Sequence, residues 1–173
     1  MGLMAKSIHV LVCVLCAFFS SGVAHAQADK QGAIDLNNKV SKMIANLYQD
    51  GDYWGKEFSH IDSTTRKYSE LAPIRIKMER LLVENLIALK TMHDVGGSYN
   101  FRMAAIQFME VDKGVLNNAF KGIEQLKPNA SPQEMQKAVS NLNKESKKEE
   151  AELKKIRKLQ IEYGKQNGFK VTN

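Results

Sequence analysis

Apolar residues recur at intervals of three and four along almost the whole chain after residue 33, and strand-like alternation is nearly absent. This spacing places the apolar side chains on one face of an α helix. The pattern predicts four amphipathic helices, at about 34–61, 63–95, 98–127 and 131–166. Their similar lengths and short connections favour an all-α, antiparallel up-down-up-down four-helix bundle with long helices, packed in the manner of a coiled coil.

Glycine, proline and small polar residues mark the expected helix boundaries. Gly51 weakens the first helix and predicts an interruption or kink there. Residues 62–65 have the composition of a turn followed by a helix N-cap. Pro73 either kinks the second helix or lies in its first turn. The pair Gly96–Gly97 is expected to end the second helix, and Ser98 to cap the third.

The second helix has the widest apolar stripe, because residues 81–83 and 86–89 are both uninterrupted apolar runs. A helix that is apolar around so much of its circumference is expected to be buried on more than one side.

The fourth helix has the clearest start and stop signals in the chain. Ser131–Glu134 places serine at the N-cap, proline at the first helical position and glutamate at the third, which is a capping box. Asn167–Gly168 predicts the end of the helix, with Phe169 folding back onto its last turn. Two polar residues, Glu149 and Gln160, interrupt the apolar seam. They either fix the register of packing or mark where the helix leaves the bundle.

The N-terminus has the three parts of a secretory signal: Lys6, a mostly apolar run over 10–23, and small residues at Ala24 and Ala26. We therefore expect residues 1–26 to be a signal peptide and 27–173 to be a single mature domain in the periplasm or on the cell surface. A membrane anchor is the alternative, but the apolar run is shorter than the roughly 20 residues that a span needs.

Removal of residues 1–26 changes the composition that bears on function. Both cysteines, Cys13 and Cys16, are lost, which excludes a disulfide, a catalytic thiolate and a covalently attached haem in the mature chain. The net charge falls from +6 to +5 because Lys6 is removed. This mild excess favours acidic partners but is no nucleic-acid signature. No second long apolar stretch follows, so no transmembrane segment is expected after the signal.

Candidate metal or haem ligands are few. Glu57 and His60 have the Glu-x-x-His spacing that di-metal bundles use twice, together with further glutamates. His93 could hold a haem with one of the methionines. The simpler interpretations are a solvated surface pair and a histidine near a helix C-terminus. No serine, histidine and aspartate set is visible. The sequence therefore predicts no catalytic residue, no metal site, no cofactor and no enzymatic activity.

Two features are candidates for partner binding. The basic residues Lys154, Lys155, Arg157 and Lys158 could bind an acidic protein, a glycan or an anionic lipid surface, or could simply be a solvated face. Trp54 lies in the densest aromatic cluster of the chain, where it either packs in the core or anchors a partner.

Residues 97–123 include Gly-Ser-Tyr-Asn-Phe-Arg-Met-Ala-Ala-Ile-Gln-Phe-Met and, further on, Val115-Leu116-Asn117. This pattern, together with the charged helix from Lys137 to Phe169, resembles a family of bacterial surface proteins found in leptospires and in Bacteroidetes-type bacteria. The resemblance implies an exported helical bundle and carries no established activity.

These features together predict an exported envelope or surface protein that acts by non-enzymatic binding. A periplasmic chaperone-like helical protein is the alternative, although one apolar stripe per helix argues against a large exposed apolar patch. A haem- or metal-binding bundle is the second alternative.

Overall fold

The computed structural model describes the backbone of residues 3–61 and 67–171, and the side chains of 29–61 and 67–171. Within these ranges every regular element is helical, which confirms the predicted all-α fold. The turn and N-cap expected at 62–65 lie outside the described residues. The elements in chain order are α1 (Leu3–His60), η1 (Tyr68–Leu71), α2 (Ala72–Thr91), α3 (Tyr99–Val115), η2 (Leu116–Phe120), α4 (Lys121–Glu124) and α5 (Pro132–Gln166).

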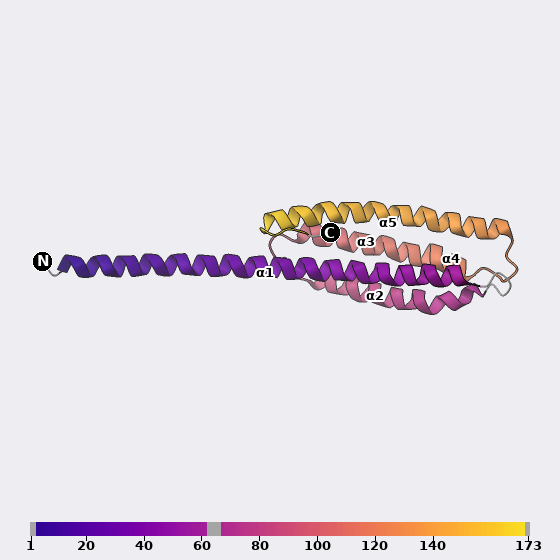
Figure 1. Ribbon diagram of the computed structural model, residues 1–173, viewed down its shortest axis with the longest axis horizontal. Helices are drawn as coiled ribbons and strands as arrows, with labels where there is room; N and C mark the ends of the chain where they lie inside the picture. The colour runs from indigo at the N-terminus through magenta and orange to yellow at the C-terminus, as the bar shows by residue number, and fades with distance from the viewer. Residues whose placement is uncertain (1–2, 62–66, 172–173) are drawn as a thin grey trace.

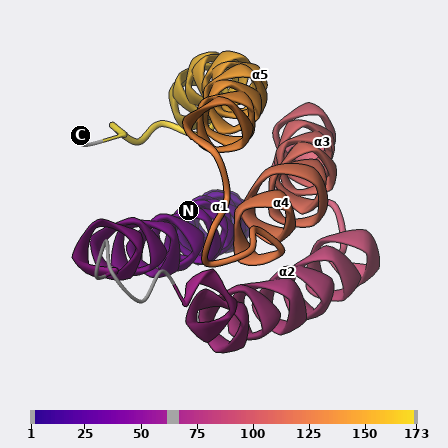
Figure 2. The ribbon, with the colours of Figure 1, turned by 90° about the vertical axis from the view of Figure 1, so that its right-hand side faces the viewer.

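The long helices lie side by side, and in Figure 1 the chain reverses direction from each to the next. The end-on view in Figure 2 shows α1, α2, α3 and α5 arranged around a common centre. The N-terminal part of α1 extends beyond the other helices (Figure 1). Among the helices of the described residues, none is long and apolar enough to cross a membrane.

The expected interruption at Gly51 is wrong, because α1 continues through it without a break. Gly51 lies on the inner side of the helix, where a Cβ atom would come within 3.7 Å of Met78 Cε. The neighbouring Leu47 and Trp54 are both buried in the core. Their packing outweighs the roughly 1 kcal/mol by which glycine disfavours a helix.

The second helix begins at Ala72, and Pro73 lies in its first turn, where a missing N–H does no harm. The helix ends at Thr91, earlier than the predicted residue 95. Arg102 of α3 explains this end, because its guanidinium donates to the backbone carbonyls of Leu89 (3.3 Å) and Met92. The last carbonyl groups of α2 are thereby satisfied by a side chain instead of by a further helical turn.

The link between α2 and α3 is built differently from the prediction. Gly96 and Gly97 have positive φ angles of 57° and 71° and lie in the link itself, beyond the helix end. Ser98 does not cap α3 through its side chain. Its hydroxyl instead accepts from Val95 N–H (3.2 Å) and donates to Asp94 (2.7 Å), so that it stabilises the turn.

The predicted burial of α2 on more than one side is also wrong. Ile76, Val83 and Ile87 are 40%, 49% and 59% exposed. The opposite face of the helix packs in the core through Met78 and Leu82. The sequence of α2 is therefore more apolar than its position in the bundle requires.

The third predicted helix contains a π-helical turn, η2, between α3 and α4. Lys121 N–H donates to Leu116 O, five residues back, which widens the turn by one residue. Leu116, Ala119 and Phe120 are all buried as a result, and the Phe120 ring stacks on Trp54 with 4.0 Å between ring centroids.

Both ends of α5 form as the sequence predicts. Ser131 Oγ accepts from Glu134 N–H (3.2 Å), and the Glu134 carboxylate accepts from Ser131 N–H (2.7 Å), which confirms the capping box. At the C-terminal end, Phe169 N–H donates to Gly164 O (2.9 Å), and Gly168 has a φ of 68°. The Phe169 ring lies edge-on against Tyr163, which confirms the fold-back.

A buried carboxylate joins three helices at the end of the bundle where α1 finishes. Glu124 is 7% exposed and accepts from Arg75 Nε of α2 (2.7 Å) and Trp54 Nε1 of α1 (3.4 Å). Arg75 also donates to Glu79 (2.6 Å). Removal of Glu124 would leave Arg75 with only the more exposed Glu79 as a partner, and Trp54 Nε1 without its acceptor.

We expect Glu124→Gln to lower the free energy of unfolding by about 3 kcal/mol, because it leaves the Arg75 charge buried beside a neutral amide. Urea unfolding followed by circular dichroism measures this change. Glu70→Gln is the control, since Glu70 pairs with Lys67 on the surface, and it should cost less than about 0.5 kcal/mol. Equal effects of the two substitutions would contradict the structural role of Glu124.

Candidate functional site

A hydrogen-bonded bridge connects α1 and α5 near the C-terminal end of α5. Gln160 is buried, and its Nε2 donates to Asn37 Oδ1 and to Ser41 Oγ, both at 2.9 Å. Gln160 is thus one of the two polar seam residues noted in the sequence, and its partners lie more than 100 positions away along the chain. This position supports the interpretation that the seam glutamine fixes the register of α5 on α1.

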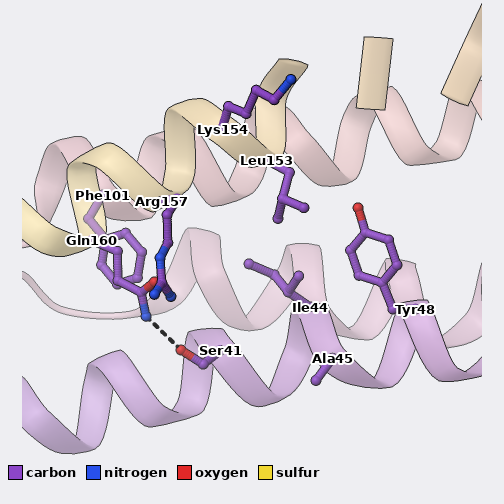
Figure 3. A pocket seen from close by; sticks show the side chains of 9 residues that line it. All are labelled: Ser41, Ile44, Ala45, Tyr48, Phe101, Leu153, Lys154, Arg157 and Gln160. Carbon is purple, nitrogen blue, oxygen red and sulfur yellow. Dashed lines mark hydrogen bonds between the residues drawn. The ribbon is translucent and has the colours of Figure 1, made fainter. Parts of the chain in front are cut away.

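A groove of ≈ 550 Å³ begins beside this bridge and separates α1 from α5. Ile44, Ala45 and Tyr48 line it from α1, Leu153 lines it from α5, and Phe101 of α3 contributes at its inner side. Figure 3 shows the Ile44 and Leu153 side chains facing each other across the space. The groove therefore has largely apolar walls, and its volume lies in the range typical of small-molecule sites.

Arg157 is the cation that extends into this groove. In Figure 3 its side chain reaches from α5 towards α1 and ends beside Gln160. Arg157 is partly buried, and its guanidinium forms no hydrogen bond or ion pair with any of the side chains that the structure describes. A guanidinium that enters a largely apolar groove without an acceptor is available to pair with an acidic ligand.

The other basic residues predicted for partner binding do not join Arg157 in the groove. Lys154 lines its edge, but its side chain points away from α1 in Figure 3 and its ammonium group pairs with Glu150 (2.6 Å). Lys155 pairs with Glu152 (3.5 Å), and Lys158 is exposed. The four residues therefore point in different directions around α5, and only Arg157 faces the groove from within it.

Trp54 must be removed from the candidate partner surface. Its side chain is 1% exposed and stacks with the rings of both Phe58 and Phe120. Of the two interpretations of the aromatic cluster, core packing is the one that the structure supports, because a partner cannot reach a ring that is almost fully buried.

A second, smaller cavity of ≈ 300 Å³ adjoins the groove at Tyr48 and contains an acidic pair. Asp112 of α3 is 4% exposed, and its Oδ2 atom has no hydrogen-bond partner. Burial, and then the nearby charge of Glu149, raises the pKa of Asp112 from 3.8 to about 7. Burial also raises the pKa of Glu149, against the opposing effect of a hydrogen bond with Tyr48.

The sequence contained a signal for Asp112 that its apolar neighbours obscured. Phe108, Asp112 and Val115 continue the four-and-three spacing of the apolar stripe of α3, so a buried position for the aspartate could have been inferred. Nothing in the local sequence distinguishes Arg157 from Lys154 or Lys158, since the rotation of α5 decides which of them faces α1.

The two histidines considered as ligands lie apart. His60 is exposed at the end of α1 and lines a surface cavity of ≈ 460 Å³ with Glu57 and Glu70. His93 is exposed in the link between α2 and α3. Among the described residues, no group of three or more histidine, cysteine, aspartate or glutamate side chains is placed to hold a metal ion.

The acidic pair predicts how stability depends on pH. The folded chain keeps a proton on Asp112 up to about pH 7, whereas the unfolded chain releases it near 3.8. The folded state thus binds more protons between these values, so the free energy of unfolding should fall as the pH rises through this window. The fall should reach up to about 4 kcal/mol, at about 1.4 kcal/mol per pKa unit.

Urea unfolding at about pH 4 and about pH 8 measures this effect. Asp112→Asn mimics the protonated acid, so we expect the variant to lose much less stability between these two pH values than the wild type. Glu84→Gln, on the exposed side of α2, serves as the control for removal of one acidic group. An Asp112→Asn profile that parallels the wild-type profile would show that Asp112 ionises normally.

Comparison of the chain with protein family models, curated proteins and solved structures finds no match. The resemblance to bacterial surface proteins therefore stays a prediction from residues 97–123 and from the last helix.

Proposed function

We propose that this protein is an exported, non-enzymatic binding protein of the bacterial envelope, and that the groove between α1 and α5 holds its ligand. The observation that carries the proposal is the unpaired guanidinium of the partly buried Arg157, inside a groove with largely apolar walls. This combination suits a ligand that has an apolar body and an acidic group, because the body covers Ile44 and Leu153 while the acid pairs with Arg157.

Export is supported by the first 26 residues, which combine Lys6, an apolar run and the small residues Ala24 and Ala26. A mature chain that begins at Gln27 would contain all of the residues that line the groove.

A chaperone-like role is the second candidate, and the exposed face of α2 favours it. Ile76, Val83 and Ile87 lie on the same side of that helix and are at least 40% exposed. Such a face could hold unfolded clients, which bind to exposed apolar surface. The two candidates differ in the surface they use, so substitutions on α2 and in the groove separate them.

Export predicts a processed protein. When the full chain is expressed in a Gram-negative host, we expect the periplasmic extract to contain a protein whose intact mass lacks residues 1–26. Ala26→Phe should block cleavage, because signal peptidase reads small residues at this position and at Ala24. An unprocessed wild-type chain in the cytoplasm would overturn this part of the proposal.

The groove predicts specific binding of an apolar acid, and the fluorescent dye anilinonaphthalene sulfonate is a suitable probe. We expect the processed protein to bind one dye molecule. Arg157→Gln should weaken binding about tenfold or more, as loss of one charge-assisted contact implies. Ala45→Trp should abolish binding, because Ala45 is an exposed residue of the groove wall and the larger ring fills the space.

Lys158→Gln is the matched control for this experiment, because Lys158 is next to Arg157 on the same helix but is exposed and does not line the groove. It should change dye affinity less than about twofold, as expected for an exposed charge. Binding that survives Arg157→Gln and Ala45→Trp would rule out the groove. Loss of binding in Ile87→Ser instead would favour the chaperone-like candidate.

A further inference from the structure

We infer that the ligand of the α1–α5 groove is a medium-chain fatty acid, with its carboxylate at Arg157 and its alkyl chain between Ile44 and Leu153. This inference rests on the proposed function and specifies the chemistry of the same site. Three properties of the groove lead to it: the donors at one end, the apolar walls, and the size of the space.

The polar end of the groove offers donors that fit a carboxylate. Arg157 presents a guanidinium with no acceptor among the described residues, and a guanidinium binds the two oxygens of a carboxylate in a fork. Ser41 also lines this end, and its oxygen already accepts from Gln160. The hydroxyl hydrogen of Ser41 is then left to donate. A cation and a hydroxyl donor side by side select an acid rather than an amine.

The rest of the groove suits an alkyl chain. Ile44, Leu153 and Phe101 are its larger apolar lining residues, and Ala45 on the exposed side leaves room because its side chain is small. The hydroxyl of Tyr48 lies at the far end, near the Glu149 carboxylate. Between Ser41 and Tyr48 the residues that α1 contributes to the wall, Ile44 and Ala45, are apolar, and burial of methylene groups is the interaction they can make.

The length of the groove favours an acid with one alkyl chain of moderate length. From Ser41 to Tyr48 the α1 wall is about 10 Å long, at 1.5 Å per residue. Arg157 and Ser41 lie at one end of this groove of ≈ 550 Å³ and Tyr48 lies at the other, so a carboxylate at Arg157 directs its alkyl chain along the wall. The length of the wall matches a medium-chain acid.

The experiment is isothermal titration of the processed protein with decanoate, below its micelle concentration, and with decanol as the uncharged analogue. We expect decanoate to bind and to displace anilinonaphthalene sulfonate, and decanol to bind at least about tenfold more weakly because it cannot pair with Arg157. In Arg157→Gln the affinities for decanoate and decanol should become equal, whereas Lys158→Gln, outside the groove, should preserve the difference.

The position of the alkyl chain in the groove is tested by comparing the affinities of fatty acids of different length. Each methylene buried in the groove should raise affinity about fourfold, so decanoate should bind on the order of a hundredfold more tightly than hexanoate. The longer palmitate should gain little more, because its additional methylenes extend beyond the groove. A steady rise in affinity up to palmitate would overturn the assignment of a medium-chain ligand.

Two failures are distinguishable. Dye that binds in the groove but is not displaced by decanoate would overturn the fatty acid while leaving the proposed binding function in place. Dye that does not bind, or that binds independently of Arg157 and Ala45, would overturn both the fatty-acid ligand and the proposed binding function. Equal binding of decanoate and decanol to the wild type would also overturn the inference, because the head of the ligand would then not be recognised.

Discussion

The buried carboxylate of Glu124 is the contact on which the arrangement of α1, α2 and α4 depends. It accepts from Trp54 of α1 and from Arg75 of α2, and it lies at the end of α4. A charge in this position is stable only while its partners stay in place, so the relative positions of the three helices are fixed together. Because the carboxylate satisfies both donors in the interior, the aromatic cluster around Trp54 can pack without leaving the indole N–H unpaired.

The opposite end of the bundle is closed by α5, and the groove follows from how that helix is held. Tyr163 donates to Val95 O and Asn167 donates to Gly96 O, both at 2.9 Å. The close approach requires glycine at position 96, since a Cβ there would lie 2.0 Å from Asn167 Oδ1. With α5 attached to this link, and bridged to α1 through Gln160, the two helices leave the groove between them beside the bridge.

Periodicity predicted the helices because an apolar stripe at helical spacing needs a core in any fold of this length. It also predicted the ends of α5, where Ser131 and Gly168 act through local hydrogen bonds that depend on neighbouring residues alone. The errors have the opposite origin. The continuity of α1 through Gly51 depends on the packing of Leu47 and Trp54 in the core. The end of α2 depends on Arg102, which belongs to the next helix, and the Phe120 ring of the π-helical turn packs against Trp54.

The candidate site was predicted only in part, because its residues do not share a sequence motif. Arg157 belonged to the basic group identified from the sequence, yet its selection from that group depends on the rotation of α5, which the contact of Gln160 with Asn37 fixes across the bundle. Asp112 and Arg75 occupy core positions in apolar stripes, where simple patterning expects apolar side chains. Polar residues inside a stripe were thus the more informative signal, since each requires a partner or a ligand.

The electrostatics of the groove give a bound acid one favoured direction. Arg157 lies at the end next to Gln160, whereas Glu149 and Asp112 lie beyond Tyr48 at the other end. A carboxylate is attracted to the first end and repelled from the second to the extent that the acidic pair is ionised. Burial raises the pKa of both acids, and that of Asp112 reaches about 7, so the repulsion grows as the pH approaches neutrality. The pair that lowers the stability of the folded chain near neutral pH therefore also helps to orient the ligand.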